Sequence, residues 1–124
     1  MSSNGLAPPI GPGALAVIFT SLRTAGDDGY AQTSEEMVRL AAGQEGFLGV
    51  ESARGEDGLG ITVSYWRDEA AIMAWKAQAD HLAAHAAGKS RWYRAYRVRV
   101  CRIEREYGFE RSDPVPGNAL LISG

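Results

Sequence analysis

Hydrophobic and polar positions change their spacing several times along the chain, and each change predicts a structural element. The run from Ala14 to Leu22 carries apolar side chains at both odd and even positions, which is typical of a β-strand covered on both faces. Two later segments, Phe47 to Ala53 and Leu59 to Arg67, are separated by residues 55–58 (GEDG) and predict a β-hairpin. A last alternating segment, from Tyr93 or Arg94 through Tyr107, predicts a long strand.

Two segments show the spacing of amphipathic helices. The first is expected to start at Asp27 or Asp28, which can cap it, and to end at Ala42, with Gly43 in the left-handed conformation. The second is expected to start after Asp68, which caps it, and to end at Gly88. Its apolar stripe consists of Ile72, Trp75, Ala79, Leu82 and Ala86.

The resulting order, β-α-β-β-α-β, predicts a ferredoxin-like α+β fold in which two helices cover one face of a four-stranded antiparallel sheet. The third predicted strand presents Ile61, Val63 and Tyr65 on one side and Trp66 on the other. Two helices leave the second face of the sheet open, and an exposed apolar sheet face is usually an interface. We therefore predict a homodimer that packs sheet against sheet.

Residues 14–109 are predicted to form the folded domain. Residues 1–13 contain three prolines and three glycines without any period, which indicates a flexible arm. Residues 110–124 are predicted to form a tail, which contains two prolines. A chain of 124 residues is long enough for one core that needs no disulfide or structural metal.

Composition and charge argue against several classes of function. No apolar run approaches the roughly 20 residues that cross a bilayer, and no basic residue precedes the first apolar run as it would in a secretory leader, so we expect a cytoplasmic protein without membrane attachment. The net charge of −2 gives no global attraction to nucleic acid. Six basic residues between His81 and Ile103 are expected to pair with carboxylates on neighbouring strands. Cys101 is the single cysteine, so neither an internal disulfide nor a Cys-rich metal site is expected.

Aromatic side chains are concentrated in three predicted elements: the end of the third strand, the second helix and the start of the fourth strand. Six of the eleven aromatic residues lie there: Tyr65, Trp66, Trp75, Trp92, Tyr93 and Tyr96. These elements meet where the second helix covers the sheet, so the rings either fill an ordinary core and dimer contact or line a pocket. An aromatic pocket suits a flat, mostly apolar ligand held by stacking.

His81 and His85 lie one helical turn apart on the second predicted helix. The pair is open to three interpretations: solvated or edge-packed side chains, a general base or haem ligand, or two ligands of one divalent metal. No third ligand and no HExxH glutamate accompany the two histidines, so we predict no metal site. The chain also has no GxSxG motif and no glycine-rich phosphate loop, which argues against nucleotide-dependent catalysis.

Three segments resemble those of one family. They are VIFTSLR near the start, EGFLGVESAR in the second strand, and GITVSYWRDEAAIMAWKAQADHLAAHAAGKSRWYRAYRVRVCRIEREYGF. They are similar to the antibiotic biosynthesis monooxygenases, a family of small dimeric α+β barrels, and the resemblance covers about residues 14–109. The family includes cofactor-free monooxygenases that oxidise aromatic polyketides and monooxygenases that degrade haem. The resemblance therefore implies a dimeric barrel and, if the chain is an enzyme, an oxidoreductase.

In the haem-degrading branch, an asparagine on the first strand works with a tryptophan and a histidine ten residues apart on the second helix. Trp75 and His85 show that spacing, and Trp66 precedes Trp75 by nine residues, as a tryptophan of that branch also does. The resemblance implies that His85 is the axial haem ligand and that a tryptophan distorts the porphyrin. The asparagine does not carry over, because the first strand has Phe19 or Thr20 at that place.

The cofactor-free branch implies another use of the same side chains. A deprotonated phenol or anthrone can itself donate an electron to oxygen, so the protein needs only to desolvate and orient it, take a proton and stabilise the oxyanion. The expected catalytic residues are His81, His85, Trp75 and Trp66. The expected substrate contacts are Tyr65, Trp92, Tyr96, Arg99 and Phe19.

The function predicted from the sequence is a cofactor-independent monooxygenase that acts on a small aromatic or quinol-like compound in a pocket between the second helix and the sheet. Two alternatives stay open. One is a haem-binding or haem-degrading monooxygenase. The other is a non-enzymatic dimeric small-molecule-binding or stress-response module.

Overall fold

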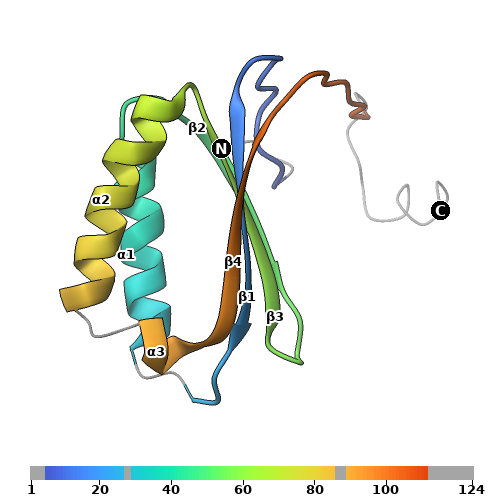
Figure 1. Cartoon of the computed structure of the whole chain (residues 1–124). Helices are drawn as coiled ribbons and strands as arrows, with labels where there is room; N and C mark the ends of the chain where they lie inside the picture. Colours follow the sequence, from blue (N-terminus) through green and yellow to red (C-terminus); the bar gives the residue numbers. More distant parts are fainter. Residues whose placement is uncertain (1–4, 27–28, 86–88, 112–124) are drawn as a thin grey trace, which may run out of the picture.

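Four strands form one antiparallel sheet, and two long helices lie over one of its faces (Figure 1). The structure is a computed structural model that describes residues 5–26, 29–85 and 89–111, except the side chains of residues 83–85 and 89–90. The elements are β1 (Leu15–Arg23), α1 (Tyr30–Ala42), β2 (Phe47–Arg54), β3 (Leu59–Trp66), α2 (Glu69–His85), α3 (Lys89–Trp92) and β4 (Tyr93–Arg102). The strand order is β2-β3-β1-β4. The predicted ferredoxin-like fold is therefore confirmed, with the short helix α3 as an addition.

The first helix begins and ends differently from the prediction. α1 starts after Gly29, and no side chain of the described residues caps it, while Asp27 and Asp28 lie outside the described residues. Gly43 follows α1 with φ −88°, a right-handed conformation, so the predicted left-handed cap was wrong. The Gly43 N–H instead bonds back to the carbonyls of Arg39 and Leu40, which lets the last turn close without a left-handed residue.

The second helix begins as predicted. The Asp68 carboxylate accepts a hydrogen bond from the Ala71 N–H at 2.9 Å, which satisfies a helix N–H that has no partner within the helix. This bond, together with the neighbouring Arg67 guanidinium, holds the pKa of Asp68 below its usual range. α2 ends at His85, and the predicted stop at Gly88 lies outside the described residues.

The fourth strand is shorter than predicted, because it ends at Arg102 and not at Tyr107. Ile103 still exchanges hydrogen bonds of 2.9 Å with Gly13 and Ala14, just before β1 begins. Beyond that point β1 offers no partner, so the alternating residues that follow do not extend the sheet.

The register of the strands decides which side chains face the helices. Leu15 on β1 lies opposite Trp66 on β3 and Arg102 on β4, and opposed residues of antiparallel strands point to the same face. Trp66 is fully buried in the core that Leu15 forms with residues of both helices. The helix-facing side chains are therefore Leu15, Val17, Phe19 and Ser21 on β1, Thr62, Ser64 and Trp66 on β3, and Tyr96, Val98, Val100 and Arg102 on β4.

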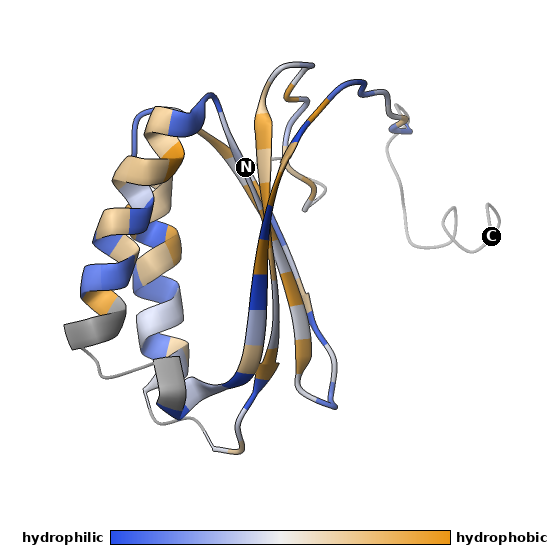
Figure 2. Cartoon of the chain, viewed as in Figure 1, coloured by the Kyte–Doolittle hydropathy of each residue, from blue (hydrophilic) through white to orange (hydrophobic). Residues whose placement is uncertain are grey.

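The opposite face of the sheet, here called the outer face, carries Ile61, Val63 and Tyr65, as the alternation predicted. Figure 2 shows the same alternation of hydrophobic and hydrophilic residues along β4.

Part of the segment before β1 is held by carboxylates: the Ala7 N–H donates to Glu51 at 3.0 Å, and the Gly11 N–H donates to Glu106 at 2.7 Å. The prediction of a flexible arm over residues 1–13 did not include these contacts. Within the described residues, no helix combines the length and hydropathy needed to cross a membrane.

Candidate functional site

The helix-facing side of β4 is open. α1 packs against β2 and α2 packs against β3, whereas β4 is the edge strand beyond β1 (Figure 1). Val98 and Val100 face the helix side, yet each keeps 48% of its surface exposed, and Tyr96 keeps 42%. Together with Phe19 on β1, they form an apolar surface that we call the β4 surface (Phe19, Tyr96, Val98 and Val100).

Aromatic rings in mutual contact border one end of the β4 surface. The ring centroid of Phe19 lies 5.3 Å from that of Tyr96 and 5.5 Å from that of Tyr93. Tyr30, the first residue of α1, continues the contact, with its centroid 5.8 Å from Tyr93 and 5.9 Å from Trp92 of α3. The helices and the sheet thus supply a continuous cluster of five rings.

An irregularity in β4 brings Tyr93 into this cluster. The pairing of β1 with β4 shifts between Leu22 and Arg23, and a bulge of this kind redirects side chains next to it. Burial and a hydrogen bond with Tyr30 raise the pKa of Tyr93, while the charges of Arg54 and Arg23 oppose that rise. The Tyr93 phenol therefore stays protonated and keeps its hydrogen bond with Tyr30 inside the cluster.

One row of residues crosses the sheet beside the rings. Arg54 on β2, Gly60 on β3, Ser21 on β1 and Tyr96 on β4 are successive partners in the register. The Arg54 Nη2 donates to Ser21 Oγ at 2.8 Å and to the Tyr30 hydroxyl at 3.3 Å. This reach depends on Gly60, because a Cβ built there would lie 2.6 Å from the Arg54 Nη2.

A second guanidinium lies on the same group of rings. The Arg23 Cζ is 3.7 Å from the centroid of the Tyr30 ring, which is the geometry of a cation–π contact. The Arg23 Nε also donates to the Trp92 carbonyl at 2.9 Å. Positive charge therefore borders the aromatic cluster from both β1 and β2.

The structure brings three of the predicted site residues together: Phe19, Trp92 and Tyr96. Trp75 instead packs against the core, with its ring 5.6 Å from that of Trp66. Trp66 is fully buried, and its indole N–H donates to Ser64 Oγ at 2.9 Å. The prediction that Trp66 acts on a ligand was therefore wrong, because the side chain is enclosed in the core.

Tyr65 and Arg99 do not belong to this side of the sheet. Tyr65 lies on the outer face, where its hydroxyl donates to Glu51 at 2.7 Å; burial and this carboxylate raise the pKa of Tyr65 to about 12. Arg99 lies opposite Ile18 and shares the outer face. The prediction that both residues contact a ligand beneath α2 was wrong, because the strand alternation turns them away from the helices.

Both histidines lie on α2. His81 is exposed on α2, and the side chain of His85 lies outside the described residues. The described part of the chain contains no group of three His, Cys, Asp or Glu side chains that could hold a metal ion. Trp75, which stands ten residues before His85, is half-buried and packs against the core.

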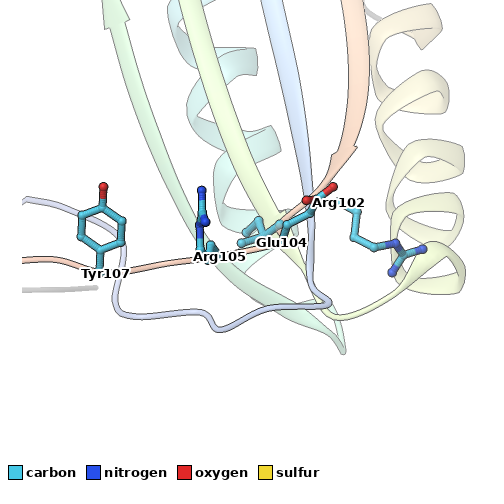
Figure 3. A pocket seen from close by; sticks show the side chains of 5 residues that line it. Arg102, Glu104, Arg105 and Tyr107 are labelled. Atoms are coloured by element: carbon cyan, nitrogen blue, oxygen red, sulfur yellow. The ribbon is translucent and has the colours of Figure 1, made fainter.

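Two of the hollows on the described surface lie outside the space between α2 and the sheet. The larger, of about 610 Å³, is lined by Arg102, Ile103, Glu104, Arg105 and Tyr107. Figure 3 shows these side chains spread along one extended segment, without a common point of convergence. The smaller, of about 480 Å³, lies at the β2–β3 hairpin, where Arg54, Asp57 and Leu59 are among its lining residues. Neither encloses the aromatic cluster, so the β4 surface is the better candidate.

Sequence reasoning missed three residues of the candidate site: Ser21, Tyr30 and Arg54. Tyr93 was among the six aromatic residues expected either to fill the core or to line a pocket. One signal was available for Arg54. The predicted hairpin brings the end of β2 opposite the start of β3, where Gly60 stands, and a glycine inside a strand often marks a close approach by another group.

Comparisons with known proteins agree with this architecture. Residues 15–87 match the profile of the family described as Antibiotic biosynthesis monooxygenase. The chain is 50% identical over 101 residues to the uncharacterized protein YqjZ of Bacillus subtilis (strain 168), covering 82% of this chain and 89% of that protein.

Solved structures with the same fold are more distant in sequence. SnoaB, a cofactor-independent oxygenase from Streptomyces nogalater, has a TM-score of 0.63 at 14% identity, with 76% of this chain and 96% of that chain covered. PA3566 from Pseudomonas aeruginosa has a TM-score of 0.58 at 17% identity, with 77% of this chain and 96% of that chain covered. At such identities the similarity concerns the fold alone.

Proposed function

The chain belongs to the antibiotic biosynthesis monooxygenase family, and from that premise we propose that it oxidises a small aromatic or quinol-like compound with molecular oxygen and without a cofactor. The observation that carries this proposal is the open β4 surface, whose Phe19 and Tyr96 belong to a continuous cluster of five aromatic rings. SnoaB, which shares the fold, is described as a cofactor-independent oxygenase.

The β4 surface suits a flat ligand. Val98 and Val100 are half exposed although they face the helix side, so a ring placed on them removes apolar area from water. An aromatic ligand also gains about 0.5–1.5 kcal/mol for each ring that it meets edge-on or in an offset stack. The Tyr93 ring contacts Phe19 and Tyr96 at the border of that surface, so it extends the aromatic area that a ligand can meet.

The proposed reaction balances without a further reductant. With an anthrone as the substrate, a base takes a proton from the activated methylene group, and the resulting carbanion transfers one electron to oxygen. Recombination of the two radicals forms a C–O bond to a hydroperoxide, and loss of water then leaves a carbonyl group. The methylene carbon is oxidised, and one molecule of oxygen is reduced to the carbonyl oxygen and one molecule of water.

We propose His85 as the base of this reaction. Figure 1 shows the C-terminal end of α2 at the same end of the molecule as α3, which carries Trp92 of the aromatic cluster. His81, one turn earlier and exposed, supplies a matched control. The expected result is a loss of oxygen uptake in His85→Ala and little change in His81→Ala.

Oxygen uptake with a panel of anthrones and hydroquinones tests the proposed activity. Val98→Glu adds a charge to the β4 surface, whereas Met73→Glu adds the same charge to an exposed position of α2, where Met73 is 64% exposed. We expect the first variant to lose most of the uptake and the second to keep it. Uptake at the level of the buffer for every compound, or equal activity of the two variants, contradicts the proposal. Ligand binding without any uptake would instead support the non-enzymatic module.

We also propose that the protein is a homodimer in which the outer faces of two sheets pack together. Leu59 and Ile61 on this face are 43% and 45% exposed, and apolar side chains grouped on a sheet face are typical of an interface. Sedimentation velocity is expected to show a dimer for the native chain and a monomer for Ile61→Glu. Met73→Glu should stay dimeric, and a native monomer would contradict this arrangement.

A further inference from the structure

Arg54 places a positive charge next to the β4 surface. Its guanidinium lies over Gly60 and reaches Ser21, whose register partner on the other side is Tyr96 of the β4 surface. Ser21 is 2% exposed, so the charged group rests on a buried hydroxyl at the border of the ring cluster. Hydrogen bonds to the Gly58 carbonyl and to Ser21 of β1 fix the position of this guanidinium over the sheet.

The partners of Arg54 are all uncharged. Its N–H groups donate to the Gly58 carbonyl, to Ser21 Oγ and to the Tyr30 hydroxyl. The Nε–H and the second Nη1–H make no hydrogen bond within the described residues. The ion pairs in the part of the chain that the structure describes do not include Arg54.

A second cation strengthens the positive potential at this place. The guanidinium groups of Arg23 and Arg54 lie 3.7 Å and 5.8 Å from the centroid of the same Tyr30 ring. Both charges also lower the pKa of Tyr93, against the larger effect of its burial, so the two charges act at the ring that contacts Phe19 and Tyr96.

From this geometry we propose that Arg54 is a specificity-determining residue that binds the ionised oxygen of an anionic aromatic ligand, a carboxylate or a phenolate, held on the β4 surface. A guanidinium forms short, charge-assisted hydrogen bonds with such oxygens. The rings of Phe19 and Tyr96 contact the apolar part of the ligand, and Arg54 selects for its charge. This inference deepens the proposed function and rests on it for the place where the ligand lies.

Two probes of the same shape and different charge test the inference. Naphthalene-2-carboxylate and naphthalene-2-carboxamide are titrated into the native protein in a calorimeter. We expect the carboxylate to bind about tenfold more tightly, because a charge-assisted hydrogen bond is roughly twice as strong as a neutral one. In Arg54→Gln most of the preference for the carboxylate should be lost, because only the charge of Arg23 remains nearby, and in Arg54→Lys a larger part of the preference should remain.

A second variant displaces the Arg54 guanidinium and keeps its charge. Gly60→Ala puts a methyl group where the Arg54 guanidinium lies, so it should also reduce the preference for the carboxylate. Arg39→Gln is the control, because Arg39 is exposed on α1 and pairs with Glu36, and it should keep the preference. Melting curves of all variants show which of them are folded.

The outcomes separate this inference from the proposed reaction. Neither probe has an activated methylene group, so binding is measured without oxidation. A preference for the carboxylate that depends on Arg54 supports the inference even if no anthrone is oxidised. Equal affinity of the native protein for both probes, or an unchanged preference in a folded Arg54→Gln variant, overturns it whether or not oxygen is consumed.

Discussion

The Arg54 side chain on β2 donates a hydrogen bond of 2.8 Å to Ser21 on β1, across the intervening strand β3. Neighbouring strands lie about 4.8 Å apart, so this contact spans roughly two strand spacings. Such a span over the surface of a sheet requires a residue without a side chain between the two partners. Gly60 is that residue, because it is the register partner of both Arg54 and Ser21.

Gly60→Ala is therefore expected to destabilise the fold. The added methyl group would lie 2.6 Å from the Arg54 Nη2, so the guanidinium must move and its bond to Ser21 is lost. Crowding of this kind together with one lost hydrogen bond costs about 1–3 kcal/mol. Urea unfolding measures the change in the free energy of unfolding.

Gly43→Ala is the matched control for this substitution. Gly43 has φ −88°, and a Cβ there would lie no closer than 3.7 Å to other atoms. The change in the free energy of unfolding should stay within about 0.5 kcal/mol. Equal losses for Gly43→Ala and Gly60→Ala would mean that the space above Gly60 is not what holds Arg54.

Trp66→Ala is expected to cost about 3–5 kcal/mol of the free energy of unfolding, because a fully buried ring leaves a cavity. Tyr107→Ala should cost close to nothing, since Tyr107 is 92% exposed. Chemical denaturation of the two variants makes the comparison. A small loss for Trp66→Ala would contradict the placement of this ring in the core.

The alternation of strand residues predicted the two faces of β3 correctly, because the period of two is a property of the extended backbone itself. The same rule applies to the residues of the site. Tyr65 and Trp66 are neighbours on β3 and must point to opposite faces, so a pocket that included both could not form. Strand alternation alone was therefore enough to exclude Tyr65.

Other parts of the site depend on the register between strands that are far apart in the sequence, and the hydrophobic pattern of one sequence does not show that register. The alignment of Arg54, Gly60 and Ser21 depends on how β1 pairs with β3, although about 40 residues separate these strands. Tyr93 faces the cluster because of a shift in pairing after Leu22, and a local irregularity of this kind leaves no mark in the hydrophobic pattern. Burial of Trp66 likewise follows from the packing of both helices against the sheet.

Asp68→Ala is expected to lower the melting temperature at neutral pH, because the variant loses the hydrogen bond to the Ala71 N–H. That bond and the Arg67 charge lower the pKa of Asp68 in the folded state. The stabilisation is therefore complete above the unfolded value of about 3.9 and is lost as the pH falls through the lower, folded value.

Melting curves across this pH range check the prediction. The difference between the native protein and Asp68→Ala should narrow below about pH 4. Asp68→Asn keeps a capping oxygen without a titrating group, so its melting temperature should stay above that of Asp68→Ala at all pH values. A difference between native protein and Asp68→Ala that does not change with pH would contradict the role of the ionised carboxylate.

The contribution of Tyr65 to the free energy of unfolding changes with pH in the opposite direction to that of Asp68, because it is lost as the pH rises. Burial and the Glu51 carboxylate raise its pKa to about 12, against about 10 in the unfolded chain, so folding favours the neutral phenol. The stabilisation is complete below about pH 10 and is lost as the pH rises from about 10 to about 12. Tyr65→Phe removes the hydrogen bond to Glu51, so it should cost about 1 kcal/mol near neutral pH and progressively less toward pH 12. Urea unfolding over this range measures the difference, with Tyr107→Phe as the exposed control; a difference that grows with pH would show that the phenol is ionised in the folded protein.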